Sequence, residues 1–160
     1  MKNIKSSLAA RFPVLKNLWP LIREFNPLTS EEIGKIEEHL GTELPETYKT
    51  FLLEIGGGGL PGFPKIQESH GESQPTIDRF FGAECEKDYW LLQNISDWNY
   101  HHPDLSQNVI PIGEDVLGNP TCLGIKGEER GKVYFYDGNE PYLVADSFED
   151  FLNRLELNEE

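Results

Sequence analysis

The sequence predicts an α+β domain in which a mainly antiparallel sheet of about four to six strands packs against N-terminal helices and a C-terminal helix. Three observations support this prediction. Apolar residues repeat at helical spacing within 29–55, short strand-like segments with tight turns follow from residue 109, and a capped apolar stripe begins at residue 147. We expect the 160 residues to form one domain with flexible ends at residues 1–14 and 157–160.

Two helices are predicted within the first 41 residues. A short opening helix is indicated by apolar residues at helical spacing, namely Leu15, Leu18, Trp19 and Ile22. Thr29-Ser-Glu-Glu32 is a capping box, because the Thr29 hydroxyl can accept from the third helical residue while Glu32 reaches back. The helix that it opens should end at Gly41 and bury Ile33, Ile36 and Leu40.

A further helix should follow at once, because Pro45 suits a first helical turn. Its apolar residues repeat at i, i+3, i+4 and i+7, as Tyr48, Phe51, Leu52 and Ile55. The next residues, 56–59, are all glycine. Glycine loops bind phosphate at helix N-termini, but this run follows the partially negative C-terminal end of a helix. The glycines therefore indicate a helix stop rather than an anion site.

The middle of the chain has weaker patterns. Residues 56–75 are rich in Gly, Pro and polar side chains, which indicates an irregular loop. Residues 75–81 alternate in the manner of a strand, with Ile77, Arg79 and Phe81 on one side. Residues 84–105 predict a short helix followed by a polar turn at 101–104.

The C-terminal third predicts an antiparallel meander closed by a helix. Short turns separate strands that are expected near 109–112, 120–125, 131–136 and 142–145. Ser147 should cap the closing helix, with Asp150 at its third position. The apolar stripe of that helix is Phe148, Phe151, Leu152 and Leu155.

The chain carries a net charge of -14, from 14 Lys and Arg against 28 Asp and Glu. The first 26 residues carry +4, and residues 27–160 carry -18. A body this acidic repels phosphates, which argues against direct nucleic-acid binding and favours a basic partner. Acidity that serves only solubility is the alternative. The chain has no run of 18 apolar residues, so we expect no membrane span. Two cysteines are too few for a disulfide framework, which fits a reducing cytoplasm. We also expect a monomer.

The turn 113–119 could hold a metal, bind phosphate or determine the fold. A calcium loop needs oxygen ligands at positions 1, 3 and 5 and a glutamate at position 12. Counted from Asp115, positions 3 and 12 hold Leu117 and Lys126, so the match fails. No GxxxxGK[ST] motif occurs either. We therefore interpret it as a fold-determining turn, in which Gly113 and Gly118 can take positive φ and in which Asp115 and Asn119 bond nearby backbone.

The sequence offers no local catalytic or metal motif. His101 and His102 are adjacent, and neighbouring side chains on an extended chain point to opposite sides. The other histidines show no HExxH or HxH spacing, neither cysteine has a nearby histidine, and no G-x-S-x-G motif is present. We expect no metal, no cofactor and no enzymatic activity.

Aromatic residues beside an acidic stretch are the candidates for partner contact. Trp and Tyr are enriched at interface hot spots, although most tryptophans of small domains lie in the core. An exposed aromatic ring beside carboxylates would form an apolar anchor with an acidic rim. The candidate residues are Glu84, Glu86, Asp88, Tyr89, Trp90, Trp98 and Tyr100.

The ordered set of motifs resembles the SUKH superfamily, specifically its Smi/Knr-like branch, over roughly residues 15–156. The motifs are the 18–22 segment LWPLI, 28–33 LTSEEI, 44–52 LPETYKTFL, 112–119 IGEDVLGN, 123–125 LGI, 131–135 GKVYF and 147–152 SFEDFL. The resemblance implies an α+β domain. Many bacterial members are immunity proteins that neutralise toxin domains, often nucleases, and fungal relatives are regulatory scaffolds in cell-wall assembly. Neither role needs a catalytic residue.

Three functional hypotheses follow. The first is a cytoplasmic immunity protein that binds a cognate toxin, expected to be a basic nuclease, through an acidic surface. The second is a regulatory or scaffolding module that binds cellular proteins. The third is a small-molecule or peptide binder that uses a groove between helices and sheet. We expect the contact surface within residues 60–108, the stretch that the resemblance covers least.

Overall fold

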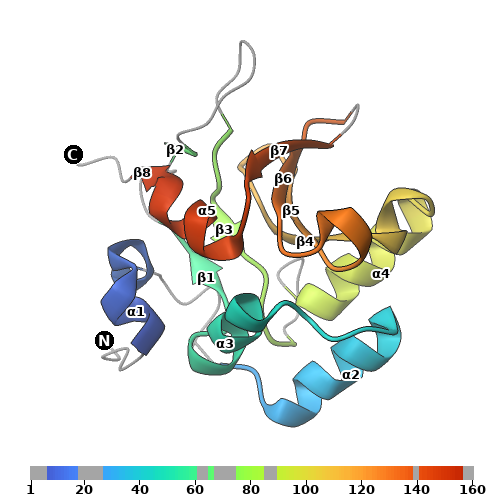
Figure 1. The fold of residues 1–160 in the computed structure, drawn as a ribbon, viewed down its shortest axis with the longest axis horizontal. Coiled ribbons are helices and arrows are strands. Elements are labelled where there is room, and N and C mark those ends of the chain that lie inside the picture. The colour runs from blue at the N-terminus through green and yellow to red at the C-terminus, as the bar shows by residue number, and fades with distance from the viewer. Residues whose placement is uncertain are drawn as a thin grey trace.

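Six strands of the described residues form one antiparallel sheet in the order β1-β3-β4-β5-β6-β7 (Figure 1). The computed structural model describes residues 7–17, 27–60, 65–66, 75–84, 90–138 and 141–156. The strands are β1 (Gly58–Gly59), β3 (Arg79–Phe80), β4 (Val109–Glu114), β5 (Pro120–Gly124), β6 (Val133–Tyr136) and β7 (Pro141–Ala145). A separate pair joins β2 (Lys65–Ile66) to β8 (Leu155–Glu156).

Helices lie beside both faces of this sheet. The α-helices are α1 (Ser7–Arg11), α2 (Ser30–Leu40), α3 (Glu46–Glu54), α4 (Leu91–His101) and α5 (Phe148–Arg154). Short 3-10 turns are η1 (Pro13–Asn17), η2 (Leu105–Gln107) and η3 (Gly127–Glu129). Figure 1 shows α4 beside β4 and β5, on the other side of the molecule from α1 and α5. The arrangement confirms the predicted α+β class.

Helix α2 begins and ends where the sequence predicts. The Glu32 amide donates to Thr29 Oγ1 at 3.1 Å, and the Thr29 amide donates to Glu32 Oε1 at 3.0 Å. Both bonds of the capping box are therefore present. The helix ends at Gly41, whose φ of 72° lies in the left-handed region that favours glycine.

The opening segment differs from the prediction. Helix α1 begins at Ser7, earlier than expected, and η1 follows it. Leu8, Phe12 and Leu15 are buried in the main core, so this segment packs closely on the rest of the domain. Residues 18–26, which include most of the predicted opening helix, lie outside the described residues.

The segment after α3 is more regular than the predicted loop. Helix α3 ends before the glycines, as expected, but Gly58–Gly59 then forms β1 and Lys65–Ile66 forms β2. The backbones come unusually close here, because a Cβ placed on Gly57 would lie 2.9 Å from the Phe81 carbonyl oxygen. The glycines therefore do more than stop a helix. They allow β1 to pair with β3 at this distance.

The predicted strand at 75–81 is reduced to Arg79–Phe80, and its alternation was wrong. Ile77, Phe80 and Phe81 are all buried. The reason is that helices cover both faces of the sheet at this point. Phe80 contacts Phe51 on one side, with ring centroids 5.0 Å apart, whereas Phe81 lies under α4 on the other. A strand buried on both faces gives a continuous apolar run.

The four predicted strands of the meander are confirmed, and their ends move by one or two residues. Prolines occupy positions that tolerate a missing N–H: Pro120 and Pro141 are the first residues of their strands. Ser147 caps α5, because its Oγ accepts from the Asp150 amide at 3.0 Å. The apolar face of α5 then completes an aromatic cluster with Phe51, Phe80, Phe148 and Phe151.

Helix α4 builds a second, smaller core on the opposite face. It is longer than the predicted short helix and includes His101, which the sequence placed in a turn. Trp98 packs with Val109, Cys122 and Tyr136, apart from the main core. No helix of the described residues has both the length and the apolar character that a membrane span requires.

Candidate binding groove

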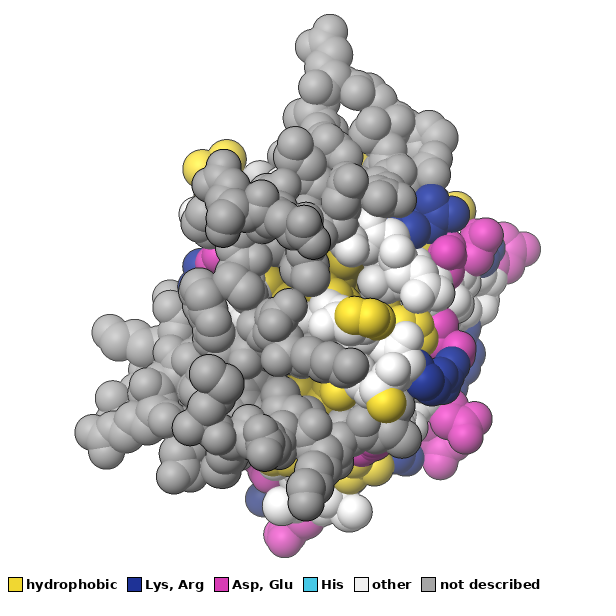
Figure 2. Space-filling view, turned by 90° about the vertical axis from the view of Figure 1, so that its left-hand side faces the viewer, with side chains coloured by type: hydrophobic (Ala, Val, Ile, Leu, Met, Phe, Trp, Pro, Cys, Tyr) yellow, Lys and Arg dark blue, Asp and Glu magenta, His cyan; other side chains and the backbone are white. Residues whose placement is uncertain are grey.

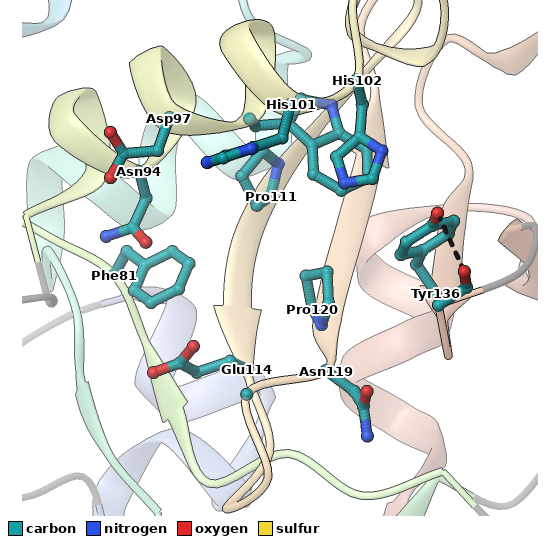
Figure 3. A pocket seen from close by; sticks show the side chains of 13 residues that line it. Phe81, Asn94, Asp97, His101, His102, Pro111, Glu114, Asn119, Pro120 and Tyr136 are labelled. Atoms are coloured by element: carbon teal, nitrogen blue, oxygen red, sulfur yellow. Dashed lines mark hydrogen bonds between the residues drawn. The ribbon is translucent and has the colours of Figure 1, made fainter.

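A cavity of about 320 Å³ lies between α4 and the faces of β4, β5 and β6 (Figure 3). We call it the α4 groove. It corresponds to the groove between helix and sheet that the third hypothesis invoked. Its volume is at the lower end of the range for small-ligand sites, which run from about 300 to 1,000 Å³.

One helical stripe forms the wall of the α4 groove. Asn94, Asp97 and His101 stand at i, i+3 and i+7 on α4 and line the cavity. This stripe lies next to the buried stripe of the same helix, which anchors α4 on the sheet. Gln93 Nε2 donates to Asp97 Oδ1 at 3.1 Å, one helical turn away, and orients that carboxylate.

The floor of the groove is apolar and uneven. Pro111 of β4, Pro120 of β5 and Phe81 line it. A proline within a strand is unusual, since it cannot donate to a neighbouring strand. Pro111 is tolerated because β3 pairs with β4 only through Arg79 and Phe80. The last backbone bond on this side runs from the Phe81 amide to the Ile112 carbonyl, so the described part of β3 does not reach Pro111. The early end of β3 thus opens the floor of the groove.

Three rings close one end of the groove. The Trp98 and His102 rings lie 4.2 Å apart, and Tyr136 meets Trp98 edge-on at 5.4 Å. Trp98 Nε1 donates to the Val109 carbonyl at 3.0 Å, and Tyr136 Oη donates to the Gly138 carbonyl at 3.3 Å (Figure 3). These bonds fix the orientation of the Trp98 and Tyr136 rings. This end of the α4 groove is therefore preformed.

Cys122 lies beneath the rings and has no chemical role that the structure supports. Its side chain is fully buried, and burial raises the pKa of the thiol far above neutrality. A thiol that stays protonated is a poor nucleophile and a poor metal ligand. Among the described residues, no group of three or more His, Cys, Asp or Glu side chains could hold a metal ion.

The 113–119 turn borders the opposite end. Asp115 is only 7% exposed. Its Oδ1 accepts from the amides of Leu117 at 2.9 Å and Asn119 at 2.8 Å, and its Oδ2 accepts from Asn119 Nδ2 at 3.1 Å. Gly118 has a φ of 87°, as proposed for this turn. The buried Asp115 carboxylate therefore holds the backbone of this turn in place through hydrogen bonds to Leu117 and Asn119.

The expectation of a positive φ was wrong for Gly113, which is absent from the positive-φ glycines of the described chain. Its role is a close approach instead. A Cβ on Gly113 would lie 2.5 Å from the Arg79 carbonyl oxygen and 2.9 Å from Ile77 Cδ1. A register shift in β4 between Pro111 and Gly113 accompanies this contact.

The tip of the same turn is apolar and exposed. Val116 is 56% exposed and Leu117 is 83% exposed, although both are aliphatic. Gly118 and Asn119, the next residues, line the groove. A rigid turn therefore presents two aliphatic side chains at the edge of the cavity.

The charges around the groove are mainly negative. Glu114 Oε1 lies 3.6 Å from Arg79 Nη1, but Arg79 also donates to Asp78 at 2.7 Å. One guanidinium is thus shared by two carboxylates, and the trio carries a net charge of about -1 at neutral pH. On the face seen in Figure 2, by contrast, Lys and Arg side chains alternate with Asp and Glu along one edge. Along that edge, basic side chains therefore interrupt the acidic ones.

The residues predicted for partner contact are distributed over several places. Trp98 is 5% exposed and belongs to the core, whereas Tyr100, two residues later on α4, is 84% exposed. Glu84 and Trp90 line a smaller cavity of about 90 Å³ near the start of α4. The remaining predicted contacts, Glu86, Asp88 and Tyr89, lie outside the described residues.

Sequence reasoning missed Asp97, Glu114 and Phe81 as groove residues. The helical spacing of 94, 97 and 101 was a usable signal, because these positions form a polar stripe beside an apolar one. The proximity of that stripe to β4 was not visible in the sequence.

Comparison with known proteins places this fold in a family. The chain is similar to the SPbeta prophage-derived uncharacterized protein YokK of Bacillus subtilis (strain 168), with 29% identity over 156 residues, covering 79% of this chain and 74% of YokK. It is also similar to the immunity protein YxxD of the same organism, with 21% identity over 142 residues and 86% of each chain covered. The model of the SMI1 / KNR4 family (SUKH-1) matches residues 27–154. The chain therefore belongs to the SMI1 / KNR4 family (SUKH-1), as its motifs indicated.

Proposed function

We propose that this chain is an immunity protein, which binds a cognate toxin and neutralises it. The observation that supports this proposal most is the similarity to a protein named as an immunity protein, which extends over 86% of both chains. Similarity across nearly the whole domain favours a shared mode of action over a shared fragment. Identity of 21% leaves the toxin itself to be determined from this chain's own surface.

The charge of the chain favours a toxin with a basic surface, and we propose a nuclease. Residues 27–160 carry a net charge of -18. A nuclease presents basic side chains to the phosphates of its substrate, so an acidic protein can cover the same groove. Opposite net charges also accelerate the encounter. The inhibitor would then act by occupying the substrate groove, as a monomeric single domain in the cytoplasm and without chemistry of its own.

Co-expression with the toxin encoded beside its gene tests the proposal. We expect cells that express the toxin to grow only when this chain is present. A catalytically inactive toxin should co-elute with the chain in size-exclusion chromatography. Phe51→Asp is a suitable control, because Phe51 is fully buried and a charge there should abolish the fold and the protection together.

Two results would contradict different parts of the proposal. Continued killing without a complex refutes the immunity function for that pair, and a pull-down that yields several housekeeping proteins would then favour regulatory scaffolding. A toxin that is neutralised but cleaves neither DNA nor RNA in vitro refutes only the nuclease assignment. Electrostatic steering predicts in addition that the association rate falls as the salt concentration rises.

A further inference from the structure

We infer that the α4 groove receives an arginine side chain of the protein partner. The inference rests on the proposed protein-binding function, and it names the chemistry of one contact. The cavity identifies the site, since it is preformed and lies between rigid elements. The charges and rings of its lining then specify the occupant.

Two carboxylates from different elements face the same end of the α4 groove. Asp97 projects from α4 and Glu114 from the end of β4, and Figure 3 shows them with Phe81 between them in this view. Glu114 lies 3.6 Å from Arg79 Nη1, and Arg79 also pairs with Asp78 at 2.7 Å. Among the described residues of this end, three carboxylates, Asp78, Asp97 and Glu114, thus accompany one guanidinium, which makes it complementary to a positive charge.

The rings favour a guanidinium over an ammonium ion. His101 offers an exposed ring on the α4 wall, whereas Phe81, Trp98 and Tyr136 line the cavity as buried rings with 1%, 5% and 8% of their surface exposed. A planar guanidinium stacks on aromatic faces and donates two parallel bonds to a carboxylate, whereas a lysine ammonium is compact and strongly hydrated. The methylene groups of an arginine can also cover the apolar surfaces of Pro111 and Pro120.

The apolar tip beside the groove suits a protein partner better than a free small cation. Leu117 and Val116 are exposed at one edge of the cavity, and the Asp115 bonds hold them in place. A partner that inserts an arginine can cover this tip with its own surface. Arginine is enriched at interface hot spots, and surrounding contacts such as this apolar tip exclude water from them.

A titration with N-acetyl-arginine amide tests the groove without knowledge of the partner. We expect chemical-shift changes in ¹H–¹⁵N spectra to concentrate at residues 94–101 and 111–119. The uncharged citrulline amide should produce none of them, and N-acetyl-lysine amide should produce weaker ones. Asp97→Asn and Glu114→Gln should each reduce the apparent affinity about threefold or more. Glu38→Gln removes an exposed carboxylate of α2 outside the groove and should change nothing.

Several results would overturn the inference. These are equal shifts with citrulline amide, shifts that lie outside the groove, or an effect of Glu38→Gln as large as that of Asp97→Asn. An equal response to the lysine amide overturns the choice of a guanidinium. Glu114→Gln also removes the ion pair with Arg79 and could disturb the fold. Asp97 is exposed, so Asp97→Asn should fold normally and tests the groove by itself.

The toxin complex separates this inference from the proposed function. There we expect Asp97→Asn and Glu114→Gln each to raise the Kd about tenfold, mainly through faster dissociation. If both variants bind and protect like the unmodified chain, the groove assignment fails and the immunity function stands. If the arginine amide binds in the groove but no toxin is neutralised, the immunity function fails and the site stands.

Discussion

Asp115 should contribute more to stability than any other single residue of the 113–119 turn. Its carboxylate accepts three hydrogen bonds from Leu117 and Asn119 while only 7% of the residue is exposed. A hydrogen bond to a charged group contributes about 1.5–3 kcal/mol, and the Leu117 amide can turn to water when its acceptor is lost. We therefore expect Asp115→Ala to lower the free energy of unfolding by about 2–3 kcal/mol. Asp115→Asn keeps one acceptor oxygen and should lower it by about 1 kcal/mol.

Urea unfolding, followed by tryptophan fluorescence and circular dichroism, measures both variants. The midpoint should fall while the m-value stays constant, because the native fold is retained. Leu117→Ala is the matched control in the same turn, and its exposed side chain predicts a change within about 0.5 kcal/mol. The reasoning is refuted if Asp115→Ala costs no more than Leu117→Ala, or if the asparagine variant is as unstable as the alanine variant.

Three further predictions concern stability. Gly34→Ala should raise the free energy of unfolding by about 0.5–1 kcal/mol, because the new Cβ meets nothing within 4 Å inside α2; a urea midpoint that falls would contradict this. Thr121→Val should raise it by about 1 kcal/mol in the same assay, because the Thr121 hydroxyl is buried without a hydrogen-bond partner among the described residues; a loss would show that the hydroxyl is satisfied. Hydrogen bonds from Thr47 and Arg11 lower the pKa of Glu149, so its contribution is present above the unfolded pKa of about 4.3 and is lost as the pH falls through the folded value. The difference in urea midpoint between the unmodified chain and Glu149→Gln should therefore shrink below about pH 4, and a constant difference down to pH 3 would contradict the assignment.

The sequence predicted correctly those helix ends that are fixed by hydrogen bonds between residues close together in the chain. The Thr29 capping box, the Gly41 stop and the Ser147 cap each satisfy backbone groups nearby, so the sequence contains their whole cause. Two of the family motifs, 28–33 and 147–152, contain the Thr29 and Ser147 caps. This is why the fold class could be predicted, and why the family could be identified, before any tertiary contact was known.

Tertiary contacts decided the features that the sequence left open. Phe80 and Phe81 are adjacent and both buried. A strand pattern with one buried face predicts only one of them as buried, and both are buried here because helices cover both faces of the sheet. β1 exists because β3 offers it a partner, and Gly57 permits the close approach. The groove needs α4 to lie over Pro111, and no residue spacing within one element encodes that position.

Charge and groove should control different steps of binding. The net charge of -18 on residues 27–160 acts over a distance and influences the rate of encounter with a basic partner. Neutralising a carboxylate remote from the groove should therefore lower the association rate slightly and weaken the dependence of that rate on salt. Asp97 acts only at contact, so its loss should raise the dissociation rate and leave the salt dependence nearly unchanged. Selection on the partner can then alter Asp97 or His101 without cost to the fold, because these side chains are exposed and anchor no core. Glu114 differs from these two residues, because it lies in the 112–119 motif and pairs with Arg79, so its replacement should disturb the native structure more than that of Asp97.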